Sequence, residues 1–486
     1  MHNLSIPIIG LAIAVIVLVF LVLRTKVHPL IAMIAAACIA GITGGMPANE
    51  TIDAIIKGFG TTLGTIGIVI GLGVMMGRIL EVSGAAEQIA YSFIKFLGQR
   101  REEWALAFTG YIVSIPIFVD SAFVILYPIS KALSKKGKRS LLTFGVSLAG
   151  GLVVTHTMVP PTPGPLGAAG IFGVDIGAMM LLGLVLAIPC TLSIVWYAQW
   201  LGKKYPGLPE ELIIGKDLKT IRDNYLKEKA SQPLPTLTMS LLPIVVPILL
   251  IFIKAVINFF PELSVTGIAT IRFSVEVINF IGTPVIALCI STLIAVYTLV
   301  PSLDRQQSSA RLEEGLQSAG IILMVTGAGG ALGFVVRESG AGTQLAAKIA
   351  NLPFSPIMIP FFVATVLRLI QGSGTVAMIT SSSITAPILS HVPGVNMLFA
   401  AQAAVIGSFF FSYFNDSLFW VVNRLMGITE VKHQLMTWSV PTTIAWATGG
   451  VLIALVNLVF GTHGSLFDPL IPLLGLGVIF VAVRGK

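Results

Sequence analysis

Long apolar runs recur along almost the whole chain and alternate with short polar segments. Eleven of these runs approach the roughly 20 residues that an α-helix needs to cross a bilayer. They cover residues 4–23, 29–45, 60–80, 141–158, 176–200, 238–257, 277–301, 317–337, 396–414, 438–460 and 466–484. The pattern predicts an all-α polytopic membrane protein with about 11 transmembrane helices.

Two further apolar stretches, 104–134 and 355–390, do not fit this scheme. Each is too long for one membrane-spanning helix and too short for two, and each has a polar break near its middle. At about 1.5 Å per residue, two arms of about 15 to 18 residues would bring the break deep into the bilayer. We therefore expect two re-entrant hairpins.

Composition agrees with a membrane protein and excludes other classes. The 486 residues are 55% hydrophobic and 11% charged, whereas soluble domains have about 25% charged residues and disordered chains are poor in apolar ones. The three cysteines, Cys38, Cys190 and Cys289, lie far apart in apolar runs and indicate core positions, not a disulfide or zinc framework. The chain has no GxxxxGK[ST], GxSxG or HExxH motif. We expect no ATPase or hydrolase activity, no catalytic residue, and no metal or cofactor.

The formal charge of +8 reflects orientation in the membrane, so no nucleic-acid partner is expected. With the N-terminus outside, 23 of the 30 lysines and arginines fall in cytoplasmic loops or the cytoplasmic C-terminal tail. Both ends of 104–134 are then cytoplasmic and both ends of 355–390 are external, so the two hairpins enter from opposite sides. The first apolar run has no signal-peptide flanks and is predicted to be a retained helix.

An internal repeat is indicated at an offset of 256 residues, where eight identities fall within twenty positions. They pair Gly71, Gly73, Gly77, Ser83, Gly84, Ala85, Gln88 and Ala90 with Gly327, Gly329, Gly333, Ser339, Gly340, Ala341, Gln344 and Ala346. The matched helices run in opposite directions, which predicts an inverted repeat. The first repeat is 1–200 with hairpin 104–134, and a cytoplasmic linker covers 201–237. The second repeat is 238–460 with hairpin 355–390, followed by an extra helix in 461–486. Inverted repeats with interrupted helices are typical of secondary transporters.

Two acidic residues and one histidine are the candidates for ion coupling. Of 22 acidic residues, only Asp120 and Asp416 lie within apolar segments, where a carboxylate costs several kcal/mol unless it is paired, hydrated or protonated. His156 is the only one of six histidines within an apolar span, and four prolines in the next nine residues end its helix. The alternatives are a helix cap for the acids and a core position for the histidine.

The break of the second hairpin, Gly372-Ser373-Gly374-Thr375, indicates a binding site for an anion. Glycines let backbone N–H groups approach a ligand, and a helix that begins there directs its positive end toward it. The alternative is an ordinary tight turn. Arg368, on the preceding arm, is a secondary candidate that either pairs with the anion or extends to a membrane surface.

Several motifs together resemble the gluconate permease family. They are Thr61-Thr62-Leu63-Gly64-Thr65-Ile66-Gly67, Leu80 to Glu87, Val159-Pro160-Pro161 after His156, Gly372 to Ala377, and Asn415-Asp416-Ser417-Leu418-Phe419-Trp420. The resemblance spans nearly the whole chain. It implies proton-coupled uptake of gluconate or related hydroxy acids across a bacterial inner membrane, with D-serine for some members. It also implies the ion-transporter superfamily fold and a homodimer. Phe118-Val119-Asp120-Ser121 and Thr162 depart from the family pattern at positions expected to touch the ligand, so the resemblance implies the class of substrate and not gluconate in particular.

These observations lead to the hypothesis of a proton-coupled symporter for a small organic anion. Its partners are that anion, protons and the lipid bilayer. The predicted ion-coupling residues are Asp120, His156 and Asp416. The predicted substrate-binding residues are Ser121, Thr157, Gly372, Ser373, Gly374, Thr375, Asn415 and Ser417. Sodium coupling and a D-serine-type carrier are the nearest alternatives, followed by a passive channel and a membrane-embedded enzyme.

Overall fold

The computed structural model describes residues 6–25, 27–97, 101–137, 140–206, 234–258, 269–300, 305–349 and 352–484. Over these residues the chain forms helices joined by turns, without a strand. The prediction of an all-α fold is therefore confirmed. Most of the linker predicted at 201–237 lies outside the described residues.

The helices of the first part of the chain follow one another with short breaks. They are α1 (Ile6–Leu23), α2 (Pro29–Thr43), α3 (Ala48–Val82), α4 (Ala85–Leu97), α5 (Glu102–Val113), α6 (Val119–Gly137), α7 (Leu141–Met158), α8 (Pro163–Phe172) and α9 (Ile176–Lys204). The prolines at 160–165 end α7 and begin α8, because proline cannot continue a helix but is tolerated in its first turn.

The second part contains more and shorter helices. They are α11 (Leu237–Asn258), α13 (Ala269–Ile281), α14 (Pro284–Leu299), α15 (Arg305–Glu338), α16 (Ala341–Ile349), α17 (Met358–Gln371), α18 (Gly374–Leu389), α19 (Met397–Gly407), α20 (Ser417–Met426), α21 (Val431–Gln434), the π-helical turn η1 (Leu435–Ser439), α22 (Val440–Phe460) and α23 (Leu470–Arg484).

Six of the described helical segments are long and apolar enough to cross a membrane, or seven if α13 and α14, bent by 70°, count as one span. Others are shorter apolar helices. The span predicted at 396–414, for example, is helical only as α19, which ends at Gly407.

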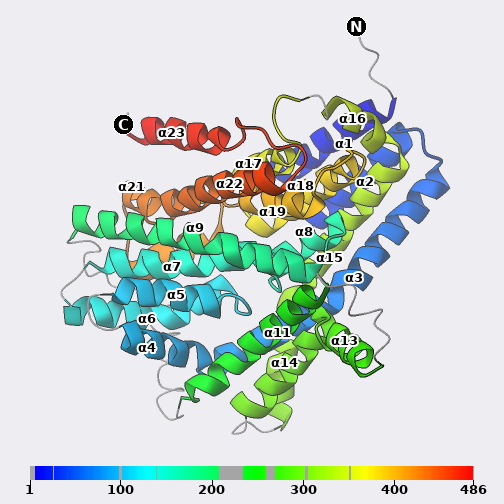
Figure 1. Ribbon diagram of the computed structural model, residues 1–486. Coiled ribbons are helices and arrows are strands. Elements are labelled where there is room, and N and C mark those ends of the chain that lie inside the picture. The colour runs from blue at the N-terminus through cyan, green and yellow to red at the C-terminus, as the bar shows by residue number, and fades with distance from the viewer. Residues whose placement is uncertain are drawn as a thin grey trace.

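The two longest helices, α3 and α15, cross the molecule side by side (Figure 1) and pack along much of their length. Helix α2 packs against this pair at one end and α14 at the other, and α1 and α11 pack in turn on α2 and α14. Glycines permit the close contact: a Cβ atom on Gly330 would lie 2.0 Å from Thr62 Oγ1, and one on Gly58 would lie 2.5 Å from Phe334 Cβ. Small residues serve this purpose at many membrane helix interfaces.

Beside this pair, α5, α7, α9 and α22 form a stack in which neighbouring helices contact each other (Figure 1). Helices α8, α17, α18 and α19 lie between the stack and the α3–α15 pair, and α18 contacts both α8 and α15. The core is therefore built from helix–helix contacts throughout.

Each of the two irregular apolar stretches folds as two helices around a short turn. Helices α5 and α6 are separated by the turn at 114–118, and α17 and α18 by Gly372 and Ser373. Gly372 has a left-handed backbone (φ 75°) that ends α17, and the Ser373 side chain accepts a hydrogen bond from Val376 N at the start of α18.

The three cysteines are free thiols, but they are not all in the core. Cys190 is buried, Cys38 is half-buried and Cys289 is exposed. The expected core position is therefore wrong for Cys289, because an apolar helix in a membrane protein can turn one face outward.

Candidate functional site

A cavity of about 390 Å³ lies where the two hairpin turns meet the ends of α7 and α20. Ten of the eleven predicted site residues border it: Asp120, His156, Thr157, Gly372, Ser373, Gly374, Thr375, Asn415, Asp416 and Ser417. The other lining residues are Phe118, Val119, Val153, Pro165, Arg368, Gln371, Met378, Ser408, Phe409, Leu418 and Thr442. The structure thus brings together predicted site residues that are up to 297 positions apart in the chain, from Asp120 to Ser417.

Several helices begin at this cavity. Asp120 lies in the first turn of α6, Gly374 begins α18, and Ser417 begins α20. The first turn of a helix has unpaired N–H groups and carries the positive end of the helix dipole. The cavity is therefore suited to hold an anion.

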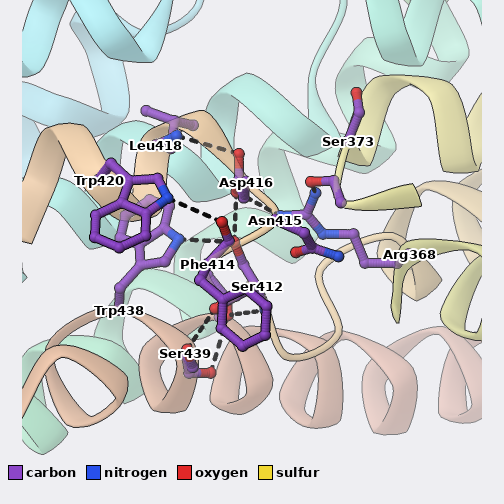
Figure 2. Close-up of polar contacts among 12 residues, drawn as sticks. Arg368, Ser373, Ser412, Phe414, Asn415, Asp416, Leu418, Trp420, Trp438 and Ser439 are labelled. Atoms are coloured by element: carbon purple, nitrogen blue, oxygen red, sulfur yellow. Dashed lines mark hydrogen bonds and ion pairs between the residues drawn. The ribbon is translucent and has the colours of Figure 1, made fainter. Parts of the chain in front are cut away.

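A buried ion pair stands at the wall of the cavity (Figure 2). Arg368 Nη2 lies 2.6 Å from Asp416 Oδ2, and the two side chains are 7% and 9% exposed. Arg368 Nη1 also donates to the carbonyl of Gly372. Arg368 thus does not extend to a surface, and its charge is placed beside the turn of the second hairpin.

Asp416 has further hydrogen bonds that fix its position. Its Oδ1 accepts from Leu418 N (3.2 Å), which caps α20, and its Oδ2 accepts from the hydroxyl of Ser412. The structural role considered for this residue, a helix cap, is therefore present. Because Asp416 also borders the cavity and pairs with Arg368, capping is only part of what it does.

Asp120 differs from Asp416 in its surroundings. Its side chain is exposed to the cavity, and among the described residues it has no hydrogen-bond or ion-pair partner. Its charge is close enough to interact with that of Asp416. Asp120 is therefore the acid of the two that can change its charge without breaking a contact.

His156 and Thr157 lie at the end of α7. The imidazole centroid is 5.6 Å from that of Phe118, and Nδ1 has no partner among the described residues.

The Asn415 side chain donates to Leu369 O (3.1 Å), which joins the segment before α20 to the end of α17. Both segments thus contribute side chains to the same wall.

Ser121 is the predicted site residue that lies elsewhere. It borders a second cavity of about 370 Å³, which shares Phe118 and Asp120 with the first. Arg78 of α3 also borders this second cavity and pairs with Glu81 (2.8 Å) and with Glu314 of α15 (2.6 Å). Asp120 is therefore in contact with both cavities.

Sequence reasoning did not find the polar network behind the site. Ser412 and Trp438 are buried and uncharged, and Trp438 Nε1 donates to Ser412 Oγ at 2.7 Å. The signals in the sequence were Arg368 and Asp416, charged residues in apolar segments, but nothing in it pairs them with each other or with these two residues. Among the described residues, no cluster of three or more His, Cys, Asp or Glu side chains could hold a metal ion.

Residues 6–459 match the family model described as the GntP family permease. This chain belongs to that family. It is 63% identical over 484 residues to an uncharacterized permease of Haemophilus influenzae, covering 100% of this chain and 99% of the relative. It is 33% identical over 449 residues to a gluconate permease of Pseudomonas aeruginosa, covering 92% and 96%. The resemblance found in the motifs is confirmed.

The fold of this GntP family permease is also found among solved transporters. The structure of MtrF from Neisseria gonorrhoeae, of a class of antimetabolite efflux pumps, superposes with a TM-score of 0.61 at 15% identity, covering 90% of this chain and 96% of MtrF. At that identity the likeness shows the fold alone. Together with the family and the long apolar helices, it confirms a multi-pass membrane transporter.

Proposed function

We propose that this permease is a secondary active transporter that couples proton entry to the uptake of a small organic anion, a sugar acid or hydroxy acid such as gluconate, across the bacterial inner membrane. The observation that carries the proposal is one cavity bordered both by groups that attract an anion and by a carboxylate without a partner. The family of the chain and its similarity to a gluconate permease of Pseudomonas aeruginosa support the substrate class.

The anion-binding part of the proposal is supported by the size and polarity of the cavity. Small-molecule sites are typically about 300–1,000 Å³, and this cavity holds about 390 Å³. Gly374 and Thr375 in the first turn of α18, with Ser373 before it, offer donors for a carboxylate. The hydroxyls of Thr157 and Ser417 and the side-chain amide of Asn415 can exchange hydrogen bonds with the hydroxyl groups of the substrate.

Asp120 is the best candidate for proton coupling. It can bind and release a proton without breaking an ion pair, whereas protonation of Asp416 would leave Arg368 without its counter-charge. His156 is a second candidate because its ring also faces the cavity. We assign Ser121 to substrate binding in the second cavity, which Asp120 also borders.

We further propose that the two repeats, 1–200 and 238–460, exchange conformations to give alternating access. In support, α3 and α15 have similar lengths of 35 and 34 residues, and each is followed by a glycine with positive φ, Gly84 (81°) and Gly340 (75°). The N-terminus outside, the C-terminus in the cytoplasm and a homodimer belong to the same proposal.

The test is uptake of labelled gluconate, glycerate, other sugar acids and D-serine into proteoliposomes containing the full chain. We expect one hydroxy acid to accumulate under an inward proton gradient with sodium replaced by choline. Accumulation that requires sodium would contradict proton coupling, and equilibration without accumulation would indicate a channel.

Variants separate coupling from binding. We expect Asp120→Asn to lose gradient-driven accumulation but to retain exchange of internal for external substrate, because exchange needs no net proton movement. Asp53→Asn is the matched control, since Asp53 is exposed on α3 and does not border the cavity. Full accumulation by Asp120→Asn would remove this residue from the mechanism.

A further inference from the structure

Arg368 is a buried charge whose hydrogen-bonding capacity is not filled. The side chain is 7% exposed and lies at the end of α17. Its Nη2 binds Asp416 and its Nη1 binds the Gly372 carbonyl, but among the described residues its Nε has no partner. A buried, charged donor without an acceptor is costly. Since the guanidinium borders the cavity, a ligand in the cavity can supply the missing acceptor.

The guanidinium lies beside the beginning of α18. A Cβ atom placed on Gly374 would lie 3.9 Å from Arg368 Nη1 and 3.6 Å from Ser408 O, which are ordinary van der Waals distances, so the first residue of α18 lies next to the guanidinium. The free N–H groups in the first turn of α18 and the positive end of its dipole act at the same place. A planar carboxylate matches the fork of N–H donors of an arginine.

A directed chain of hydrogen bonds holds this arginine in place (Figure 2). The indole N–H of Trp438 is a donor only, so Ser412 Oγ must accept it, at 2.7 Å. The Ser412 hydroxyl is then free to donate to Asp416, which accepts from Arg368 in turn. The first two bonds thus run from Trp438 to the Asp416 carboxylate, and Arg368 donates to the same carboxylate from the other side.

This chain of hydrogen bonds begins in a buried part of the fold. Trp438 is 1% exposed and lies in η1, the π-helical turn that precedes α22. Ser439, the last residue of η1, donates its hydroxyl to the backbone carbonyl of Ser412. π-Helical turns are rare and often occur at functional sites.

We infer that Arg368 and the first turn of α18 form the subsite for the carboxylate of the transported anion, and that Trp438 and Ser412 are positioning residues that orient Arg368 through Asp416. The inference rests on the proposed function, because it assumes an organic anion in this cavity. It divides the work of the charged residues: Arg368 binds the substrate, Asp416 is its fixed counter-charge, and Asp120 remains for the proton.

The test measures affinity, not accumulation. Equilibrium binding of labelled gluconate and glycerate to the purified full chain, at one pH and without a gradient, is compared with the KM and Vmax of exchange. Trp438→Phe keeps the ring and removes the donor. We expect it to raise the Kd and KM about threefold to tenfold, the effect of one lost hydrogen bond, with little change in Vmax.

Matched variants distinguish positioning from a general loss of structure. Trp446→Phe removes the same N–H from another buried tryptophan, which donates to Thr365 Oγ1 (2.9 Å) and is outside the chain of bonds to Arg368. We expect its Kd to remain within about twofold of the wild type, since none of its bonds reaches the subsite.

Arg368→Lys keeps the positive charge beside Asp416 but loses the forked N–H donors of the guanidinium. In this background, Trp438→Phe should raise the Kd by less than a further twofold, because its effect passes through the arginine. Should Arg368→Gln alone fail to fold, the double variant Arg368→Gln/Asp416→Asn leaves neither charge unpaired. We expect it to fold and to lose gluconate binding.

The outcomes separate this inference from the proposed function. Proton-driven uptake with unchanged affinity in Arg368→Lys and Trp438→Phe would overturn the subsite and leave symport standing. Weakened binding in both variants without proton-driven uptake by the wild type would support the subsite and contradict symport. The inference would be overturned if Trp438→Phe raised the Kd by the same factor in the wild type and in the Arg368→Lys background. It would also be overturned if the wild type bound neither gluconate nor glycerate.

Discussion

The contact between Gly77 and the turn of the first hairpin allows a quantitative prediction. Gly77 lies in α3, and a Cβ atom added to it would be 2.0 Å from the carbonyl oxygen of Pro116 and 3.0 Å from its carbonyl carbon. Ordinary contact begins at 3.4 Å, so Gly77→Ala must lengthen the first distance by about 1.4 Å. Both partners are backbone, so no side chain can rotate away, and the turn that leads to Asp120 must shift.

The expected size of the effect follows from two opposing contributions. Overpacking costs about 1–3 kcal/mol, while alanine stabilises a helix by about 1 kcal/mol relative to glycine. We expect a net loss of about 1 kcal/mol in stability. The effect on transport should be larger, because a misplacement of about 1 Å at a reacting site can cost up to about 100-fold in rate. We expect Vmax to fall at least about tenfold.

Two other glycines of the same helix pair serve as controls. A Cβ atom on Gly333 of α15 would lie 3.3 Å from Ser383 O, which needs little movement, and one on Gly64 of α3 would meet nothing within 4 Å. The assays are thermal unfolding in detergent and initial rates of uptake. If Gly77→Ala matched the wild type in both, or if Gly64→Ala were equally impaired, the packing argument would be refuted.

Three further predictions concern the stability of the folded protein, and each is tested by thermal unfolding in detergent. Thr365→Val leaves the buried indole N–H of Trp446 without its acceptor and should cost about 1–3 kcal/mol. Glu314→Gln removes the negative charge of one partner of Arg78 at a partly exposed position and should cost less than about 1 kcal/mol, with the cost shrinking at high salt. Burial raises the pKa of Asp468, in the loop before α23, above its ordinary 3.8. Since the folded state then holds this proton more tightly, the contribution of Asp468 to stability should be complete below pH 3.8 and be lost as the pH rises through the folded pKa, and Asp468→Asn should remove this part of the pH dependence.

The parts of the site that the sequence could predict are those with a strong local signal. A carboxylate or histidine in an apolar segment is expensive, so Asp120, His156 and Asp416 were conspicuous without any knowledge of the fold. The Gly372 turn was predictable for a similar reason, because glycine and serine interrupt an apolar stretch at a point where a helix can begin. All of these residues border the same cavity.

The parts that could not be predicted depend on how distant segments meet. Arg368 and Asp416 are 48 residues apart, and only the packing of the segment before α20 against the end of α17 pairs them. Trp438 resembles any other apolar residue until its N–H is seen to reach Ser412. Ser121 follows Asp120 directly, but successive residues of a helix point about 100° apart, so the serine faces the second cavity.

Proton coupling through Asp120 is the central claim, and its most direct test is the movement of protons that the substrate itself drives. Proteoliposomes with a pH-sensitive dye inside receive external gluconate, or the hydroxy acid that the uptake panel identifies, with no imposed gradient and no sodium. We predict acidification of the lumen with the wild type and with Asp53→Asn, and none with Asp120→Asn. Entry of substrate without acidification in the wild type, or acidification that persists in Asp120→Asn, would contradict the account.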